Sequence, residues 1–145
     1  MSAAVTGGAA VWIDADGREL TVGQSADQVE QAVRALNHLT RPGVGALTDP
    51  AGVCEISTAL ACTAHRLPQL LGQLSAWLHR EQQAGRLRVD ACSAWPDPAA
   101  TVADAITALT QAAQCAQRAG HALDAAHQRL AHLASSGDGS EADQP

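Results

Sequence analysis

Apolar residues recur at steps of three and four over most of the chain, a spacing typical of amphipathic helices. The first such stretch is predicted to begin at Ser25, where Gln28 completes a capping box, and to end in the proline and glycines of 41–45. A second begins at Asp49, an N-cap residue followed by proline at the first helical position. Its apolar residues are Val53, Ile56, Leu60, Ala64 and Leu67. Each stretch predicts a helix with one apolar face.

The most apolar segment, LPQLLGQLSAWL at 67–78, predicts a third helix that ends at Gly85. Leucines form one ridge along it, and Leu70 and Trp77 widen that ridge. Pro68 disfavours the helical conformation of the residue before it, so the chain either kinks there or begins a new helix. A face this wide is expected to contact two neighbours.

The longest periodic segment follows Asp97-Pro98 and predicts a helix from 98 to about 134. Two registers of apolar residues run along it, which predicts two adjacent seams and two contacts of the coiled-coil type. Its middle is rich in small residues, which let another helix approach closely. The first register is Val102, Ile106, Leu109, Ala113, Ala116, Gly120, Leu123, His127 and Leu130, and the second is Ala105, Leu109, Ala112, Ala116, Ala119, Leu123, Ala126, Leu130 and Leu133.

The N-terminal part contains short β-type segments. Residues 11–13 and 19–22 are predicted to pair as a hairpin around an Asp-Gly turn at 14–17, with 87–90 as a possible third strand. The predicted fold class is all-α (mainly α), a four-helix bundle-like domain with a long C-terminal helix and a small N-terminal β-hairpin. One domain is expected over 11–134, flanked by a disordered N-terminus, 1–10, and a disordered acidic tail, 135–145.

Charge and composition exclude several classes of function. The formal net charge of -6 argues against direct nucleic-acid binding, which depends on clustered basic residues. The sequence contains no run of about 18 apolar residues, so no membrane span is predicted. All nine basic residues are arginine, and Lys, Phe and Tyr are absent, a bias that indicates a GC-rich genome, such as that of an actinobacterium. We expect a cytoplasmic protein with reduced cysteines and no cofactor.

Candidate chemistry is sparse. Cys62 and His65 lie one turn apart, which suits half of a zinc site or a Cys–His nucleophile pair, but the other ligands are missing. His79 completes such a site only if the fold brings it near. Motifs such as GxSxG and HExxH are absent, so we expect no enzyme.

Part of the chain resembles a family of small actinomycete proteins with no established function. The resemblance covers about 36–90 and rests on Leu36-Asn-His38, Thr48-Asp-Pro50, Arg66-Leu-Pro-Gln-Leu-Leu71, Gln73-Leu74, Trp77-Leu78 and Ala84-Gly-Arg-Leu87. It implies a shared fold, brings no catalytic residue, and associates the chain loosely with mobile elements and gene regulation.

These observations favour a non-enzymatic scaffold or adaptor that binds itself, as a homodimer or larger homo-oligomer, or another protein. The predicted interface residues are Leu70, Trp77, Leu109, Ala113, Ala116, Gly120, Leu123 and Leu130. A monomeric bundle that satisfies its own seams is the competing interpretation. Two alternatives remain open: a ligand-binding or metal-binding bundle with its pocket near Cys62 and His65, and an accessory factor that acts through a DNA-binding partner.

Overall fold

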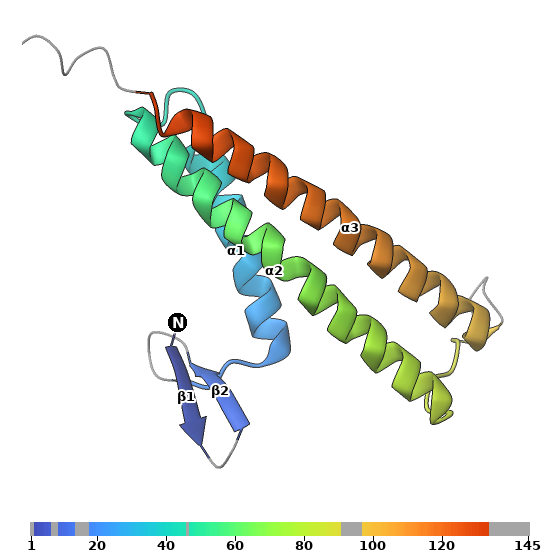
Figure 1. Ribbon diagram of the computed structural model, residues 1–145. Helices are drawn as coiled ribbons and strands as arrows, with labels where there is room; N and C mark the ends of the chain where they lie inside the picture. The colour runs from blue at the N-terminus through green and yellow to red at the C-terminus, as the bar shows by residue number, and fades with distance from the viewer. Residues whose placement is uncertain (1, 7–8, 14–17, 46, 91–96, 134–145) are drawn as a thin grey trace, which may run out of the picture. The chain divides into compact units, whose positions relative to one another are not determined.

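The chain is mainly helical, as predicted. A computed structural model describes residues 2–6, 9–13, 18–45, 47–90 and 97–133. The chain divides into two compact units, residues 1–48 and 49–145, and each is described by itself. The first unit holds two strands and one helix, and the second holds two long helices (Figure 1). The expectation of one domain over 11–134 stays a prediction.

The N-terminal hairpin differs from the predicted one. Strands β1 (Ser2–Thr6) and β2 (Ala9–Ile13) pair antiparallel, with Ala4 opposite Val11. The segment 11–13 is therefore a strand, but its partner is β1, which lies in the residues expected to be disordered. A strand over 19–22 is not supported, because Glu19 alone of these residues forms a β-bridge and a helix already begins at Val22. The predicted turn at 14–17 lies outside the described residues.

Helix α1 (Val22–Leu39) begins earlier than predicted. Thr21 is its N-cap: the Thr21 hydroxyl accepts from the Gln24 amide at 3.2 Å, and the Gln24 side chain accepts from the Thr21 amide at 2.9 Å. The Ser25 hydroxyl, the predicted cap, donates to the Thr21 carbonyl instead. The same capping-box chemistry thus occurs four residues upstream of the predicted position.

Helix α2 (Pro50–Gln83) is one continuous helix that runs through Pro68. The four-helix bundle is therefore not supported, because the second and third predicted helices form a single element and the described residues contain three helices. Proline in a helix interior costs about 3 kcal/mol. Ala64, buried on the N-terminal side of Pro68, and half-buried Leu71 on the other side pack toward the neighbouring helix, which offsets that cost.

The ends of α2 follow the predicted signals. Asp49 caps the start, where its carboxylate accepts from the Gly52 amide at 2.9 Å. At the other end Gly85 has φ +66, and the Arg86 amide reaches back to the Glu81 carbonyl in a Schellman motif. Residues 87–90 form no strand, so the predicted third strand is wrong.

Helix α3 (Pro98–Leu130) starts at the predicted cap, Asp97, and lies antiparallel beside α2 (Figure 1). The most buried residues of this helical hairpin are small: Ala61, Ala64, Val102 and Gly120. The core is thus a single layer between two helices. Such a core leaves the remaining sides of both helices exposed.

Candidate functional site

Helix α2 carries two apolar stripes that each step by three and four residues. The inner seam faces α3 and includes Ala61 and Ala64. The outer stripe is displaced by one residue, about 100° around the helix. The inner seam is Cys54, Ser57, Ala61, Ala64, Pro68, Leu71, Ser75 and Leu78, and the outer stripe is Val53, Ile56, Leu60, Thr63, Leu67, Leu70, Leu74 and Trp77.

The outer stripe is the more apolar of the two and the more exposed. Leu70 and Trp77, both predicted contact residues, are each 49% exposed, and Leu74 is 43% exposed. Single exposed leucines are normal on a protein surface, whereas a continuous row of them marks a contact site. Within the 49–145 unit, α3 therefore leaves the leucine and tryptophan face of 67–78 uncovered while small residues fill the seam between the two helices.

The predicted interface residues of α3 lie on the side that packs on α2. Gly120 is buried, and the others are half-buried: Leu109, Ala113, Ala116, Leu123 and Leu130. They belong to the first register, which here forms a seam within one chain. Their role in a contact between chains stays a prediction.

The second register of α3 gives a row of residues that is largely exposed. Each of its four alanines directly precedes a seam residue, as Leu60, Leu67 and Leu74 do on α2, and such flanking positions face each other on one side of an antiparallel helix pair. His65 and Asp124 directly follow seam residues and meet on the opposite side, at 2.8 Å. The row is Ala105, Ala112, Ala119, Ala126 and Leu133. Together with the outer stripe it forms a surface that we call the apolar face.

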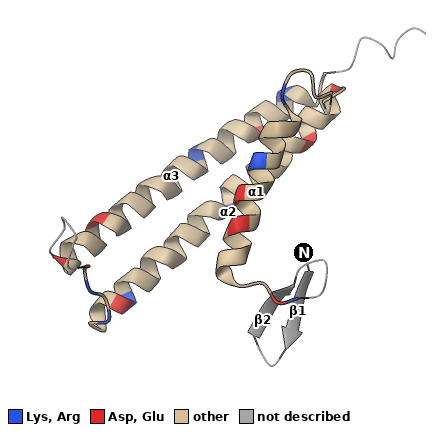
Figure 2. Cartoon of the chain, turned by 180° about the vertical axis from the view of Figure 1, so that it is seen from behind, with Lys and Arg blue, Asp and Glu red and all other residues tan. Residues whose placement is uncertain are grey.

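Charged residues are few along α2 and α3 (Figure 2). From Val53 to Trp77 the stripe contains no charged residue. Glu55 and Arg66 lie in the first half of α2, which Asp49 caps, and Arg80 and Glu81 lie in the second half. Each half of the helix therefore carries one acidic and one basic residue, and the N-cap Asp49 adds one negative charge at its start.

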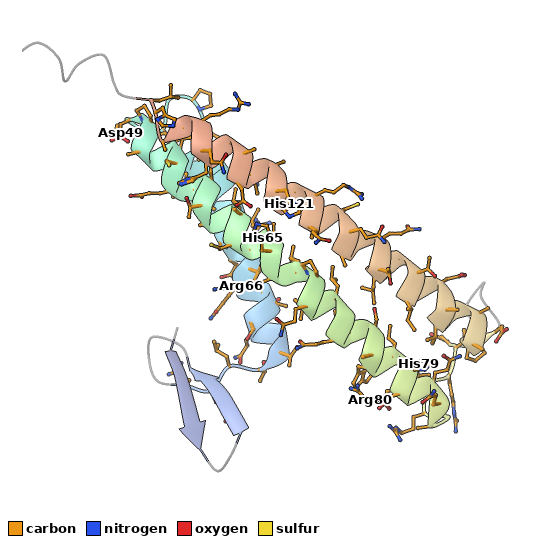
Figure 3. The ribbon with its side chains drawn as sticks, in the orientation of Figure 1. Asp49, His65, Arg66, His79, Arg80 and His121 are labelled. Atoms are coloured by element: carbon orange, nitrogen blue, oxygen red, sulfur yellow. The ribbon has the colours of Figure 1, made fainter. Side chains whose placement is uncertain are left out.

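The structure does not assemble the predicted site at Cys62, His65 and His79. Cys62 is exposed. His79 lies 14 residues beyond His65 on the same helix, about 21 Å along its axis. Figure 3 places His79 near the C-terminal end of α2, well away from His65. Within the described residues, no group of three or more His, Cys, Asp or Glu side chains is placed to hold a metal ion.

His65 instead pairs across the helical hairpin. Its Nε2 lies 2.8 Å from an Asp124 carboxylate oxygen, and its ring centroid lies 5.7 Å from that of His121. The His65 side chain is 39% exposed and that of Asp124 47%, so water weakens the pair. The arrangement fixes the register of the two helices more than it adds stability.

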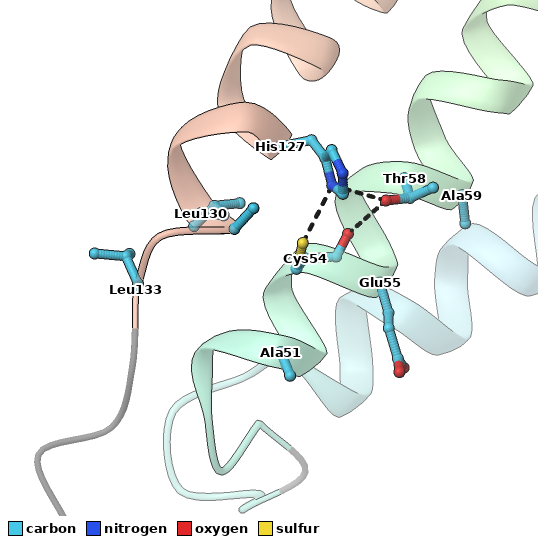
Figure 4. A pocket seen from close by; sticks show the side chains of 9 residues that line it. Ala51, Cys54, Glu55, Thr58, Ala59, His127, Leu130 and Leu133 are labelled. Atoms are coloured by element: carbon cyan, nitrogen blue, oxygen red, sulfur yellow. Dashed lines mark hydrogen bonds between the residues drawn. The ribbon is translucent and has the colours of Figure 1, made fainter. Parts of the chain in front are cut away.

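Sequence analysis missed a thiol–imidazole contact at the other end of the seam. Cys54 Sγ lies 3.1 Å from His127 Nδ1, and Thr58 Oγ1 lies 3.0 Å from the same nitrogen (Figure 4). These atoms line a cavity of about 600 Å³. His127 was placed in the first register as a seam residue, which is correct. Its partner Cys54 lies 73 residues away, so no local motif signals the pair.

None of the protein-family models, curated proteins or solved structures compared with the chain matches it. The resemblance over 36–90 therefore stays a prediction. In the part of the chain that the structure describes, no helix combines the length and the apolar character that crossing a membrane requires.

Proposed function

We propose that this protein is a non-enzymatic self-association module, and that a second copy of the chain covers its apolar face. The observation that carries the proposal is the outer stripe, a row of large apolar residues that the α2–α3 pair leaves exposed, with Leu70 and Trp77 each 49% exposed. Water-exposed leucines at heptad spacing favour association with another helix of the same spacing. A second copy supplies that spacing.

The size of the face supports a stable contact. From Val53 to Trp77 the stripe is about 36 Å long at 1.5 Å per residue, and two helices side by side make the face about 20 Å wide. The resulting area is about 700 Å² per copy, close to the ~800 Å² that each partner buries in a specific interface. The leucines of α2 alone cover about half that width.

Charge favours a second copy in the antiparallel orientation. A copy related by a two-fold axis at the middle of the stripe places its Arg80 near Asp49 of the first copy, whereas a parallel copy places each charged residue of α2 beside its own equivalent. Exposed pairs of this kind contribute about 0–1 kcal/mol each, so they select orientation and the leucines supply the affinity.

The test is the mass in solution, by light scattering after size exclusion, of wild type and of Leu70→Glu with Leu74→Glu. We expect a wild-type dimer and a helical monomer for this variant. The control, Gln69→Glu with Gln73→Glu, adds the same charge to exposed positions of the same helix outside the stripe. It is expected to remain a dimer.

Changes at Leu109 and Leu123 are unsuitable for this purpose because both line the seam within the chain, and glutamate there disrupts the hairpin itself. A wild-type monomer at about 100 μM, well above the micromolar Kd of a weak specific contact, contradicts the proposal. A dimer that survives the Leu70 and Leu74 changes also contradicts it.

A further inference from the structure

The Cys54 thiol and the Thr58 hydroxyl both lie within hydrogen-bond distance of Nδ1 of His127. The Thr58 hydroxyl has one proton, and the Cys54 carbonyl accepts it at 2.9 Å. In the tautomer that carries its proton on Nε2, Nδ1 of His127 accepts a hydrogen bond from the thiol, 3.1 Å away. If the proton moves from sulfur to Nδ1, the resulting N–H donates to the thiolate and to the Thr58 oxygen at 3.0 Å.

A thiol with a base in hydrogen-bond contact is the arrangement that activates cysteine as a nucleophile. The contact is formed inside the helical hairpin, where α2 and α3 hold both side chains, and both residues are half-buried. Positions on helices keep such a pair in register better than positions on loops do. The geometry thus supplies a nucleophile and a proton acceptor.

The cavity beside the thiol selects the partner. Its lining is mostly alkyl, from Ala51, Ala59, Leu130, Ala131 and Leu133, and Glu55 is its one charged residue among the described ones (Figure 4). A volume of about 600 Å³ falls in the range of small-molecule pockets. A compound with a hydrocarbon chain buries apolar surface against this lining, which favours its binding. A small polar reagent has no such surface to bury.

We propose that Cys54 is a modification site for apolar soft electrophiles, specifically α,β-unsaturated carbonyl compounds that carry a hydrocarbon chain. The Cys54 sulfur forms a bond to the β-carbon, and His127 takes the thiol proton. The carbon–carbon π electrons move to the α-carbon as an enolate, which then takes the proton from the imidazolium. The product is a thioether, with no leaving group and no oxidant. This inference is independent of self-association.

Two other cysteines, Cys62 and Cys115, serve as internal controls for the reactivity of Cys54. Cys62 and Cys115 are exposed, and the hydrogen bond recorded for Cys115 comes from the Arg118 guanidinium and not from an imidazole. Exposure alone favours modification of these two thiols over half-buried Cys54. A faster reaction at Cys54 therefore reports the base and the cavity.

The experiment treats the reduced full chain with trans-2-nonenal and, separately, with acrylamide, and follows each cysteine by peptide mass mapping over time. With nonenal we expect Cys54 to react at least about tenfold faster than Cys62 and Cys115, a modest part of the 10²–10⁴-fold that a positioned base supplies. With acrylamide the preference for Cys54 falls, because that reagent does not use the cavity.

His127→Gln is expected to lower the Cys54 rate to that of Cys62, while His121→Gln, a matched change elsewhere on α3, leaves it unchanged. Equal rates at Cys54, Cys62 and Cys115 of the wild-type chain overturn the proposal without any variant. So does an unchanged Cys54 rate in a folded His127→Gln chain. Equal preference with nonenal and acrylamide rejects the apolar electrophile as the partner.

Discussion

The imidazole of His65 lies directly against the backbone of Gly120. A Cβ added at Gly120 would lie 2.7 Å from His65 Cε1 and 2.8 Å from Nδ1, closer than such atoms approach. Glycine at 120 therefore leaves room for the ring that pairs with Asp124 on the same helix. Because Gly120 of α3 has no side chain, His65 can reach Asp124 across the seam.

Alanine at Gly120 is expected to behave differently from alanine at Gly72. Both glycines lie inside helices, but a Cβ at Gly72 meets nothing within 4 Å. Gly72→Ala should stabilise the chain by about 0.5–1 kcal/mol through helix propensity. Gly120→Ala gains the same propensity but displaces His65 from its contact with Asp124, so we expect no net gain in the free energy of unfolding, measured by urea denaturation.

A double variant isolates the cause. In a His65→Ala background no ring opposes the new methyl group, so Gly120→Ala should recover a gain of about 0.5–1 kcal/mol. An equal gain from Gly120→Ala in both backgrounds argues that the ring moves aside at no cost.

The sequence predicts some helix ends correctly and misplaces others. The caps at Asp49 and Asp97 and the stop at Gly85 were predicted correctly, because each depends on the chemistry of one or two neighbouring residues. The start of α1 was misplaced because Thr21 with Gln24 offers the same capping box as Ser25 with Gln28. Local signals predict the existence of a helix cap more reliably than they predict which of two equivalent residues provides it.

Long-range features were harder to predict. The inner seam of α2 includes Cys54, Ser57 and Ala61, residues that hydrophobic patterning does not mark, and the pattern instead placed the apolar face of this segment at Val53, Ile56, Leu60, Ala64 and Leu67. Helices that approach closely need small residues between them, and this requirement depends on the partner. For the same reason neither the contact of Cys54 with His127 nor that of His65 with Asp124 follows from spacing along one helix.

The ion pair at the end of α2 predicts a pH effect. The Arg86 guanidinium donates two hydrogen bonds of 2.6 Å to the Glu81 carboxylate and thereby lowers the pKa of Glu81 below its usual value. A carboxyl group whose pKa is lowered by folding adds stability above its unfolded pKa. That contribution disappears as pH falls through the folded pKa.

An NMR titration of the Glu81 side chain should therefore show a midpoint below that of an unpaired glutamate. Arg86→Gln removes the charge and the bidentate contact, so the midpoint should rise. Identical midpoints in the two proteins count against the pair in solution.

Spin labels test the antiparallel orientation of the proposed dimer. Cys62 and Ala76 lie on the same face of α2, two heptads apart. With the two-fold axis at the middle of the outer stripe, labels at 62 in two copies are offset by about 9 Å along the helices, and labels at 76 by about 33 Å. A parallel dimer gives no offset at either position.

The measurement is the distance between labels by pulsed electron paramagnetic resonance, with the other cysteines changed to serine and Ala76→Cys as the second site. A markedly longer distance at 76 than at 62 supports the antiparallel dimer. Similar short distances at both sites indicate a parallel one and reject the charge argument.

The close approach of α2 and α3 makes the inner seam sensitive to side-chain volume. Ala61 is 5% exposed and lies in the middle of this seam. Leucine there forces the helices apart or bends the side chain out of its preferred rotamer, which costs about 1–3 kcal/mol. Leucine at Ala76, an exposed position on the same helix, is expected to change stability by no more than about 0.5 kcal/mol. Thermal and urea unfolding of Ala61→Leu and Ala76→Leu compare the two directly. If Ala61→Leu is as stable as Ala76→Leu, the helices are not closely packed at residue 61, and the leucines of the outer stripe become the stronger candidates for the core.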